Sequence, residues 1–218
     1  MRGNRPLAVI SAATALAVGM WLMRDGSRTE LPPQPSAAQA FSATPGAVGP
    51  PPTSSPASPP AVPAMSASTP IRIRIPAIRV EARVIALGLD SSDHLEAPPA
   101  DDNNLVGWYQ GGVTPGQAGT AVMAGHVDNK RGLSVFYSLG RLHPGAEVEI
   151  ERKDHAVAVF AVDAVELYPK DHYPSDKVYA QAHRPELRLI TCGGAFSKKT
   201  GYLGNVVAYA HLTRTRPR

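Results

Sequence analysis

The chain has 218 residues and a formal net charge of +4, and only 6% of its residues are aromatic. So small a charge, scattered along the chain and not interleaved with aromatic residues, argues against a nucleic-acid-binding surface. A single cysteine excludes an intramolecular disulfide, so in an exported protein this residue would be a free thiol that needs an explanation.

The amino-terminal part has the pattern of a membrane anchor. A short basic segment, residues 1–5, precedes roughly 17 uncharged and mostly apolar residues at 7–23, near the lower limit for spanning a bilayer. The run ends just after Trp21, a residue that suits the membrane interface better than a signal-peptidase site. We predict an uncleaved signal anchor within residues 1–30 of a single-pass cell-membrane protein, with the rest of the chain extracellular. A cleaved signal peptide is the alternative.

Residues 31–70 are dominated by proline, alanine, serine and threonine, with few large apolar side chains. Such a composition cannot bury enough apolar surface to offset the entropy that is lost on ordering. Its Pro-Pro pairs favour extended polyproline II, so we predict a disordered, semi-rigid linker that could reach about 100 Å at about 3.1 Å per residue. It would act as a stalk that holds a folded domain away from the membrane.

The remainder, residues 71–218, has the pattern of one all-β domain. Ile71-Arg-Ile-Arg-Ile75 alternates strictly between apolar and charged residues, which is typical of a half-buried strand. Further short apolar or alternating runs, separated by turn residues, cover 84–89, 105–109, 119–125, 147–151, 157–167, 187–192 and 205–211. The two runs around Lys153-Asp154 are expected to form a hairpin. Many short strands at close spacing, with almost no long helical period, predict a β-barrel.

Two of these predicted strands end in residues that can do chemistry together. The strand at 187–192 runs into Cys192, and two glycines follow that let another backbone approach closely. The strand at 119–125 ends in a glycine followed by His126. Asp128, two residues further on, is expected to cap the next turn, or else to support the histidine. A buried structural thiol is the alternative for a lone cysteine, but the Cys/His pairing favours a nucleophile with a histidine partner.

Six segments of the domain, taken together and in their order along the chain, resemble those of a known protein family. They are Ile71-Arg-Ile-Arg-Ile-Pro-Ala-Ile78, Gly107-Trp-Tyr109, Ala124-Gly-His-Val-Asp128, Val135-Phe-Tyr-Ser-Leu-Gly140, Leu189-Ile-Thr-Cys-Gly-Gly194 and Asn205-Val-Val-Ala-Tyr-Ala210. With them the domain resembles the sortases, most closely the class F type of high-GC Gram-positive bacteria. The resemblance implies an eight-stranded sortase β-barrel with short helices, in a membrane-anchored cysteine transpeptidase. Its substrates would be secreted proteins with a C-terminal sorting signal of the Leu-Pro-x-Thr-Gly kind.

The resemblance also assigns roles to individual residues. Cys192 matches the family's nucleophile, His126 its histidine, and Thr191 the residue whose backbone is thought to help to bind the oxyanion. An arginine usually stands about thirteen positions after the cysteine, where this chain has Asn205. An amide donates only a neutral hydrogen bond, whereas charge-assisted bonds are roughly twice as strong. Either Asn205 orients the substrate or the oxyanion, or the barrel recruits Arg188, which shares the strand parity of Cys192. The competing interpretation of Arg188 is a solvent-exposed strand residue.

The implied reaction is acyl transfer in two steps. The Cys192 thiolate would form a thioester while protonated His126 gives a proton to the departing amine, and an amine of a peptidoglycan precursor or of another surface protein would then resolve the thioester. We expect no cofactor and no metal ion, because no histidine, cysteine or carboxylate pair has ligand spacing near the cysteine. Glu96, Asp101 and Asp102 lie in a loop that could bind calcium, but a solvated acidic loop is the favoured interpretation.

Three alternatives remain open. The first is a sortase-like surface binding module, with Asn205 as the sign of lost activity. The second is a cysteine transpeptidase that acts directly on peptidoglycan; those enzymes resemble a Ser-His-Gly-Cys pattern, and the distance in sequence between His126 and Cys192 argues against it. The third is a plain secreted β-domain on a stalk, with a structural thiol.

Overall fold

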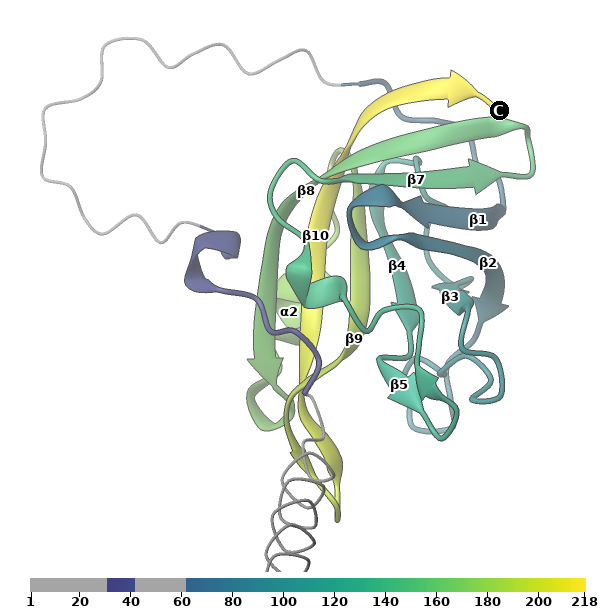
Figure 1. The fold of residues 1–218 in the computed structure, drawn as a ribbon. Coiled ribbons are helices and arrows are strands. Elements are labelled where there is room, and N and C mark those ends of the chain that lie inside the picture. The colour runs from purple at the N-terminus through teal and green to yellow at the C-terminus, as the bar shows by residue number, and fades with distance from the viewer. Residues whose placement is uncertain (1–30, 42–61) are drawn as a thin grey trace, which may run out of the picture. The chain divides into compact units, whose positions relative to one another are not determined.

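The computed structural model describes residues 31–41 and 62–218, so the anchor predicted at residues 1–30 lies outside the described part of the chain. The main element is a closed barrel of eight strands in the order β1-β2-β3-β4-β9-β10-β8-β7 (Figure 1). These strands are β1 (Pro70–Ile75), β2 (Val80–Leu87), β3 (Leu105–Tyr109), β4 (Gly119–Gly125), β7 (Glu147–Arg152), β8 (Ala156–Pro169), β9 (Pro185–Ser197) and β10 (Gly201–Pro217). The predicted all-β barrel is confirmed, as is the hairpin of β7 and β8.

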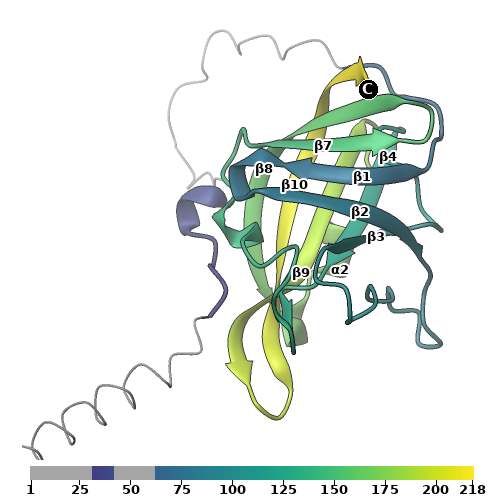
Figure 2. The same ribbon diagram turned by 45° about the vertical axis from the view of Figure 1, so that its right-hand side comes forward.

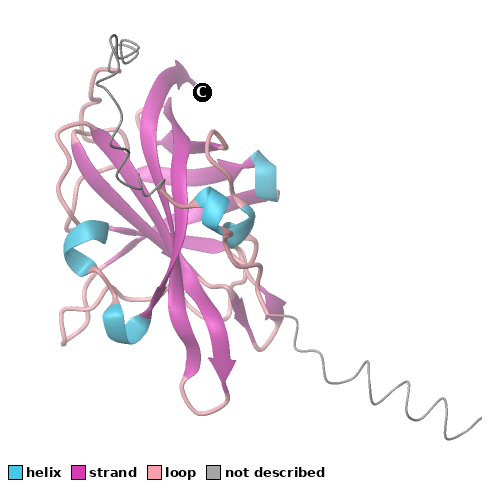
Figure 3. Ribbon diagram, turned by 90° about the vertical axis from the view of Figure 1, so that its left-hand side faces the viewer, coloured by secondary structure: helices cyan, strands magenta, loops and turns pink. Residues whose placement is uncertain are grey.

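The remaining elements are short and, apart from η1, which precedes β1, lie on connections between the barrel strands (Figure 3). They are the two-stranded ribbon of β5 (Asp128–Asn129) and β6 (Gly132–Leu133), the 3-10 helices η1 (Ala37–Gln39), η2 (Pro76–Ile78), η3 (Leu139–Arg141) and η4 (Lys170–His172), and the helix α2 (Ser175–Val178). Within residues 31–41 and 62–218, no helix has the length and apolar character needed to cross a membrane.

The order of the strands brings β4 and β9 side by side, although they are far apart in the sequence. They form a parallel pair without a shift of register, in which Ala124 is the last residue of β4 with a partner, Ile190. On its other side β9 pairs with β10 in the antiparallel sense, and these two strands project together beyond the barrel as a hairpin (Figure 2). Because β4 and β9 run in the same direction, their carboxyl ends meet at the same edge of the barrel.

The two faces of β9 pack against different groups of residues. Leu187 and Leu189 lie in the large buried cluster that fills the barrel. Ile190, together with Val207 of β10, belongs to a second buried cluster that also contains Val178 of α2. Successive side chains of a strand point to opposite faces, so the second cluster lies on the outer face of the barrel, where α2 covers it.

Residues 62–69, predicted as part of the linker, contact the barrel instead. The N–H of Met65 donates to the carbonyl of Gly116 at 2.8 Å. The guanidinium of Arg152, which is only 1% exposed, donates to the carbonyl of Ser66 at 2.5 Å. An extended proline-rich segment has no core of its own, but its unpaired backbone groups can bond to polar groups of a neighbouring surface.

The amino-terminal end of the predicted linker also contacts the barrel, which the prediction of a disordered segment did not include. Residues 31–41 contain η1, and the side-chain amide of Gln39 donates to the carbonyl of Gly140 at 2.9 Å. Residues 42–61 lie outside the described part of the chain. The composition of residues 31–70 carried no information about the docking of residues 32–41 and 62–69 onto the barrel.

Candidate active site

Cys192 lies within β9, directly opposite Asn205 of β10, and β9 continues to Ser197 instead of ending at 192 as predicted. Opposed residues of an antiparallel pair have their side chains on the same face, with Cβ atoms about 4.5–5.5 Å apart. Cys192 shares strand parity with Ile190 of the outer cluster, so the thiol and the Asn205 amide lie on the outer face of the barrel. Both side chains are half-buried. The position that usually carries the family's arginine thus lies beside the thiol.

His126 follows β4 on the opposite flank of β9. Ala124 and Ile190 form the last pair of the parallel ladder, and His126 and Cys192 each lie two residues beyond this pair, towards the same edge of the barrel. Neighbouring strands lie about 4.8 Å apart. Cys192 and Asn205 are thus opposed on β9 and β10, and His126 directly follows the neighbouring strand β4; we call these three residues the row.

Thr191 holds the ends of β4 and β9 together. Its hydroxyl donates to the carbonyl of Gly125 at 2.8 Å, and the residue is only 4% exposed. This hydrogen bond joins the residue before the histidine to the residue before the cysteine. The side chain of Thr191 is therefore buried in this hydrogen bond. Only the main chain of Thr191 could contact a substrate on the outer face.

The imidazole of His126 is oriented by the connection between β2 and β3. Its Nε2 lies 2.7 Å from the carbonyl oxygen of Pro98. A carbonyl oxygen only accepts hydrogen bonds, so Nε2 carries a proton in this arrangement. In the neutral form of this tautomer, Nδ1 is the ring nitrogen that can accept a hydrogen bond.

Arg188 shares the outer face with Cys192 but is neither solvent-exposed nor near the thiol. It is only 6% exposed, and its guanidinium donates to Glu186 at 2.8 Å and to the carbonyl of Val178 at 3.2 Å. The guanidinium carbon also lies 4.6 Å from the centroid of the Tyr209 ring. Four residues along a strand correspond to about 13 Å. The expectation of an exposed strand residue is wrong, because α2 covers this part of the face, and the ion pair with Glu186 takes up the charge.

Tyr202 and Asp128 form a pair beside the thiol that the sequence analysis did not foresee. The Tyr202 hydroxyl donates to the carboxylate of Asp128, which lies two residues beyond His126. Burial first, then the Asp128 carboxylate and, more weakly, the neighbouring Cys192 raise the pKa of Tyr202 well above its ordinary value. The hydroxyl therefore stays protonated and remains a donor near neutral pH. Tyr202 lies outside the strand predicted at 205–211, and its contact with Asp128 joins β10 to β5, which are far apart in the sequence.

The acidic residues of the loop before β3 have other partners. Glu96 accepts a hydrogen bond from the N–H of Gly88 at 3.0 Å, and Asp102 forms an ion pair with Arg83 at 3.2 Å. Among the described residues, no group of three or more histidine, cysteine or carboxylate side chains is placed to hold a metal ion.

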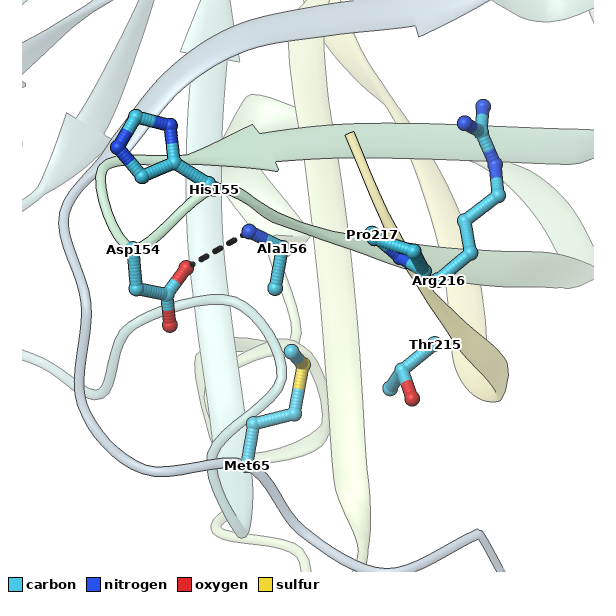
Figure 4. Close-up of a pocket in the computed structure, with 7 residues that line it drawn as sticks. All are labelled: Met65, Asp154, His155, Ala156, Thr215, Arg216 and Pro217. Atoms are coloured by element: carbon cyan, nitrogen blue, oxygen red, sulfur yellow. Dashed lines mark hydrogen bonds between the residues drawn. The ribbon is translucent and has the colours of Figure 1, made fainter.

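A pocket also lies at the other end of β10 (Figure 4). Its lining residues are Met65, Asp154, His155, Ala156, Thr215, Arg216 and Pro217. Cys192 pairs near the start of β10, whereas the pocket contains the last residues of that strand. The pocket is therefore separate from the row of His126, Cys192 and Asn205.

Comparisons with known proteins identify the barrel. The Sortase domain family model matches residues 73–213. Sortase A from Listeria monocytogenes is 16% identical, with a TM-score of 0.52, over 69% of this chain and 91% of that chain. The SrtA sortase from Actinomyces oris is 18% identical, with a TM-score of 0.51, over 73% and 89%. Sortase C-1 from the same organism is 19% identical, with a TM-score of 0.52, over 66% and 75%. No curated protein sequence matches the chain.

At these identities the solved structures establish the fold alone, and they include sortases of more than one class. The family model extends over well more than half of the chain and includes the strands that carry Cys192 and Asn205, as well as His126. The chain belongs to the sortase family.

Proposed function

We propose that this sortase is a cysteine transpeptidase that uses Cys192 as its nucleophile. The observation that supports the proposal is that Cys192 stands opposite Asn205 in the β9–β10 ladder and that Cys192 and His126 each lie two residues beyond the last β4–β9 pair. A thiol nucleophile needs an adjacent acid or base, and a histidine one strand away meets this requirement.

In the first step, the sulfur of the Cys192 thiolate bonds to the carbonyl carbon of the scissile peptide bond. The tetrahedral intermediate then collapses, the C–N bond breaks, and protonated His126 gives its proton to the departing amine. The product is a thioester on the enzyme. In the second step, an acceptor amine attacks this thioester, neutral His126 takes the amine's proton, and the C–S bond breaks to regenerate the thiolate. A neighbouring imidazolium favours the thiolate at the start of the cycle.

The surrounding residues have supporting roles in this proposal. The carbonyl of Pro98 at Nε2 orients the imidazole. Asn205, opposite Cys192, donates a neutral hydrogen bond to the substrate carbonyl or to the developing oxyanion. Arg188 is bonded to Glu186, so we assign the role of the family's arginine to Asn205.

We further propose that the substrates are secreted proteins with a Leu-Pro-x-Thr-Gly-like sorting signal. The acceptor would be the amine of a peptidoglycan precursor or of a pilin. The class F type remains our proposal for the subgroup, on the segments quoted above. We also propose that residues 1–30 anchor the chain in the cell membrane with the barrel extracellular, supported by the uncharged run at 7–23 behind a basic amino terminus.

The test is to incubate the full chain with a quenched Leu-Pro-x-Thr-Gly peptide library and to follow the protein by intact mass spectrometry. We expect a mass increase corresponding to a thioester, and fluorescence that rises with peptide cleavage. Cys192→Ala should abolish both without changing the thermal unfolding temperature, because a half-buried thiol is replaced by a smaller group. Turnover that persists in Cys192→Ala would contradict the proposed nucleophile.

A sortase-like binding module is the second candidate, and the specific observation that favours it is Asn205 at the position of the family's arginine. It predicts that peptides bind without forming any adduct, with the same affinity for the wild type and for Cys192→Ala. Fluorescence anisotropy of the same peptides measures this binding directly.

A further inference from the structure

Residues 32–41, which we call the clamp, run from the β9–β10 hairpin to the outer face of the barrel. At one end, Gln34 Oε1 accepts a hydrogen bond from the N–H of Gly194 at 2.9 Å. At the other end, the ring of Phe41 packs edge-to-face on Tyr209, with 5.0 Å between the ring centroids. The proposed chemistry gives the clamp no role, yet its first contact lies two residues beyond Cys192.

The contact with Gln34 occurs where the ladder of β9 and β10 is irregular. The register shifts so that two residues of β9, one of them Gly194, stand opposite the single residue Leu203 of β10. A bulge of this kind leaves the extra residue outside the ladder, so the N–H of Gly194 bonds to the clamp. The other end of the Gln34 amide donates to the carbonyl of Pro32 at 2.5 Å, which fixes the direction of the accepting oxygen.

Gln34 approaches the hairpin from the face opposite to the thiol. A Cβ added to Gly193 would lie 3.4 Å from Gln34 Oε1 and 2.7 Å from the side chain of Val206. Val206 belongs to the cluster inside the barrel. Cys192, one residue before Gly193, points to the other face. The Gln34 end of the clamp therefore supports the strand from the face opposite to the thiol, whereas its Phe41 end packs on Tyr209, four residues beyond Asn205 on the outer face.

The rest of the clamp is held firmly enough to act as a support. Gln39 donates from its side-chain amide to the carbonyls of Gly140 at 2.9 Å and Leu142 at 2.5 Å. The Phe41 ring lies 5.3 Å from the ammonium group of Lys177, which belongs to α2. The clamp is thus bonded to η3 and to the helix that covers the outer cluster, and it connects both to the hairpin.

We propose that the clamp is a positioning element of the active site and that Gln34 is its positioning residue. By accepting the hydrogen bond of Gly194, Gln34 holds the bulge that lies just beyond the Cys192–Asn205 pair, and so keeps the thiol opposite the amide. The kinetic consequence rests on the proposed transpeptidase activity, whereas the structural consequence does not. Removal of the acceptor should lower kcat and leave KM nearly unchanged, because the substrate-facing side of the strand is intact.

The experiment compares Gln34→Ala, Gln34→Glu and the control Gln110→Ala in the full chain. Gln110 is an exposed glutamine outside the clamp. In Gln34→Ala we expect kcat to fall about tenfold, the size of effect that the loss of one hydrogen bond can have, with KM within about twofold. Gln34→Glu keeps an accepting oxygen for Gly194 but loses the donor to Pro32, so it should restore part of the rate. Gln110→Ala should behave as the wild type.

Two readouts need no substrate. Hydrogen exchange of the Gly194 amide should become faster in Gln34→Ala but not in Gln34→Glu. Alkylation of Cys192 by iodoacetamide should stay within about twofold of the wild-type rate in both variants, because the clamp does not cover the thiol. Unchanged exchange at Gly194 would overturn the proposal. So would a higher kcat together with faster alkylation, which would mean that the clamp blocks the site. If the wild type shows no turnover, the exchange result still decides the role of the clamp, and only the transpeptidase assignment fails.

Discussion

The two ends of the barrel bind the proline-rich region in opposite ways. At the β7–β8 turn, the guanidinium of Arg152 is buried and donates to the carbonyls of Pro115 at 2.7 Å and Ser66 at 2.5 Å, and to Asp154 at 2.7 Å. At the hairpin, the neutral amide of Gln34 accepts one backbone hydrogen bond at a bulge. One contact is charged and enclosed, and the other is neutral and partly open.

The difference indicates how stability and chemistry are divided in this protein. A buried cation with several acceptors is costly to disturb, because each acceptor that loses its partner remains desolvated. Such a contact suits the end of the barrel that has no part in the proposed reaction. The Cys192 end must admit a substrate, so its row of side chains is half-buried and its supporting contact is weaker. Four substitutions test this division.

The largest effect on stability is expected at Arg152. Arg152→Ala removes hydrogen bonds to two carbonyls and an ion pair, and should lower the free energy of unfolding by about 2–4 kcal/mol. The rate per folded molecule should stay within about twofold of the wild type. Urea denaturation followed by circular dichroism measures the first quantity. Arg141→Ala, at an exposed position, is the matched control, and an equal loss in both variants would remove the distinction between the two ends.

The opposite pattern is expected at Asn205. Asn205→Ala should reduce kcat/KM about 10- to 100-fold, less than the loss of a strong oxyanion donor, because the amide is neutral. The unfolding temperature should change little, since the side chain is half-buried. Asn205→Asp keeps the size but not the donor and should be at least as slow. Steady-state cleavage of the quenched peptide measures both, and a normal rate in Asn205→Ala would exclude the amide from the reaction.

A smaller kinetic effect is expected at Tyr202. Tyr202→Phe removes the hydrogen bond to Asp128 and should lower kcat by a factor of about two to five, because one neutral donor to a carboxylate is lost. The raised pKa of Tyr202 keeps its hydroxyl protonated throughout the neutral range. The ratio of wild-type to variant rates should therefore be constant between about pH 6 and pH 9. A ratio that changes across this range would show that Tyr202 titrates during the reaction.

The smallest effect concerns acid stability at the Arg152 end. The hydrogen bond from Arg152 is the main cause that holds the pKa of Asp154 below its ordinary value of 3.8. A carboxyl with a depressed folded-state pKa contributes stability above its unfolded-state pKa and loses it as the pH falls through the folded-state value. Asp154→Asn should therefore flatten the fall in unfolding temperature below about pH 4 and leave its value near pH 7 slightly lower. Calorimetry from acid to neutral pH measures the unfolding temperature of both proteins, and an Asp154→Asn curve identical to that of the wild type would contradict the prediction.

Most of the fold could be predicted from the sequence because strands leave a local signal. The alternation of Ile71-Arg-Ile-Arg-Ile75 and the runs that end at His126 and Cys192 correspond to β1, β4 and β9 of the barrel. The outcome for Arg188 could not be predicted in this way. The alternation of side chains along the strand correctly placed Arg188 on the same face as Cys192. The burial of Arg188, however, depends on α2, a separate segment of the chain that packs over this residue.

The clamp and the Tyr202–Asp128 pair could not be predicted for a related reason. Residues 31–41 have the composition of a linker, and nothing in them signals that Gly194 will offer an unpaired N–H. The bulge that frees this group depends on the register between β9 and β10. The same register carries Tyr202 to Asp128.

The sequence by itself determined the all-β class, the positions of the strands, and the presence of one cysteine and one histidine at the ends of two of them. These features follow from side-chain alternation and turn residues, which act over a few positions. Only the tertiary structure decided that β4 and β9 are parallel neighbours, which brings His126 and Cys192 towards the same edge of the barrel, and that the clamp docks onto the β9–β10 hairpin. Strand pairing and clamp docking depend on contacts between segments far apart in the chain. The free energies of these contacts depend on the packing of the complete barrel and not on local sequence patterns.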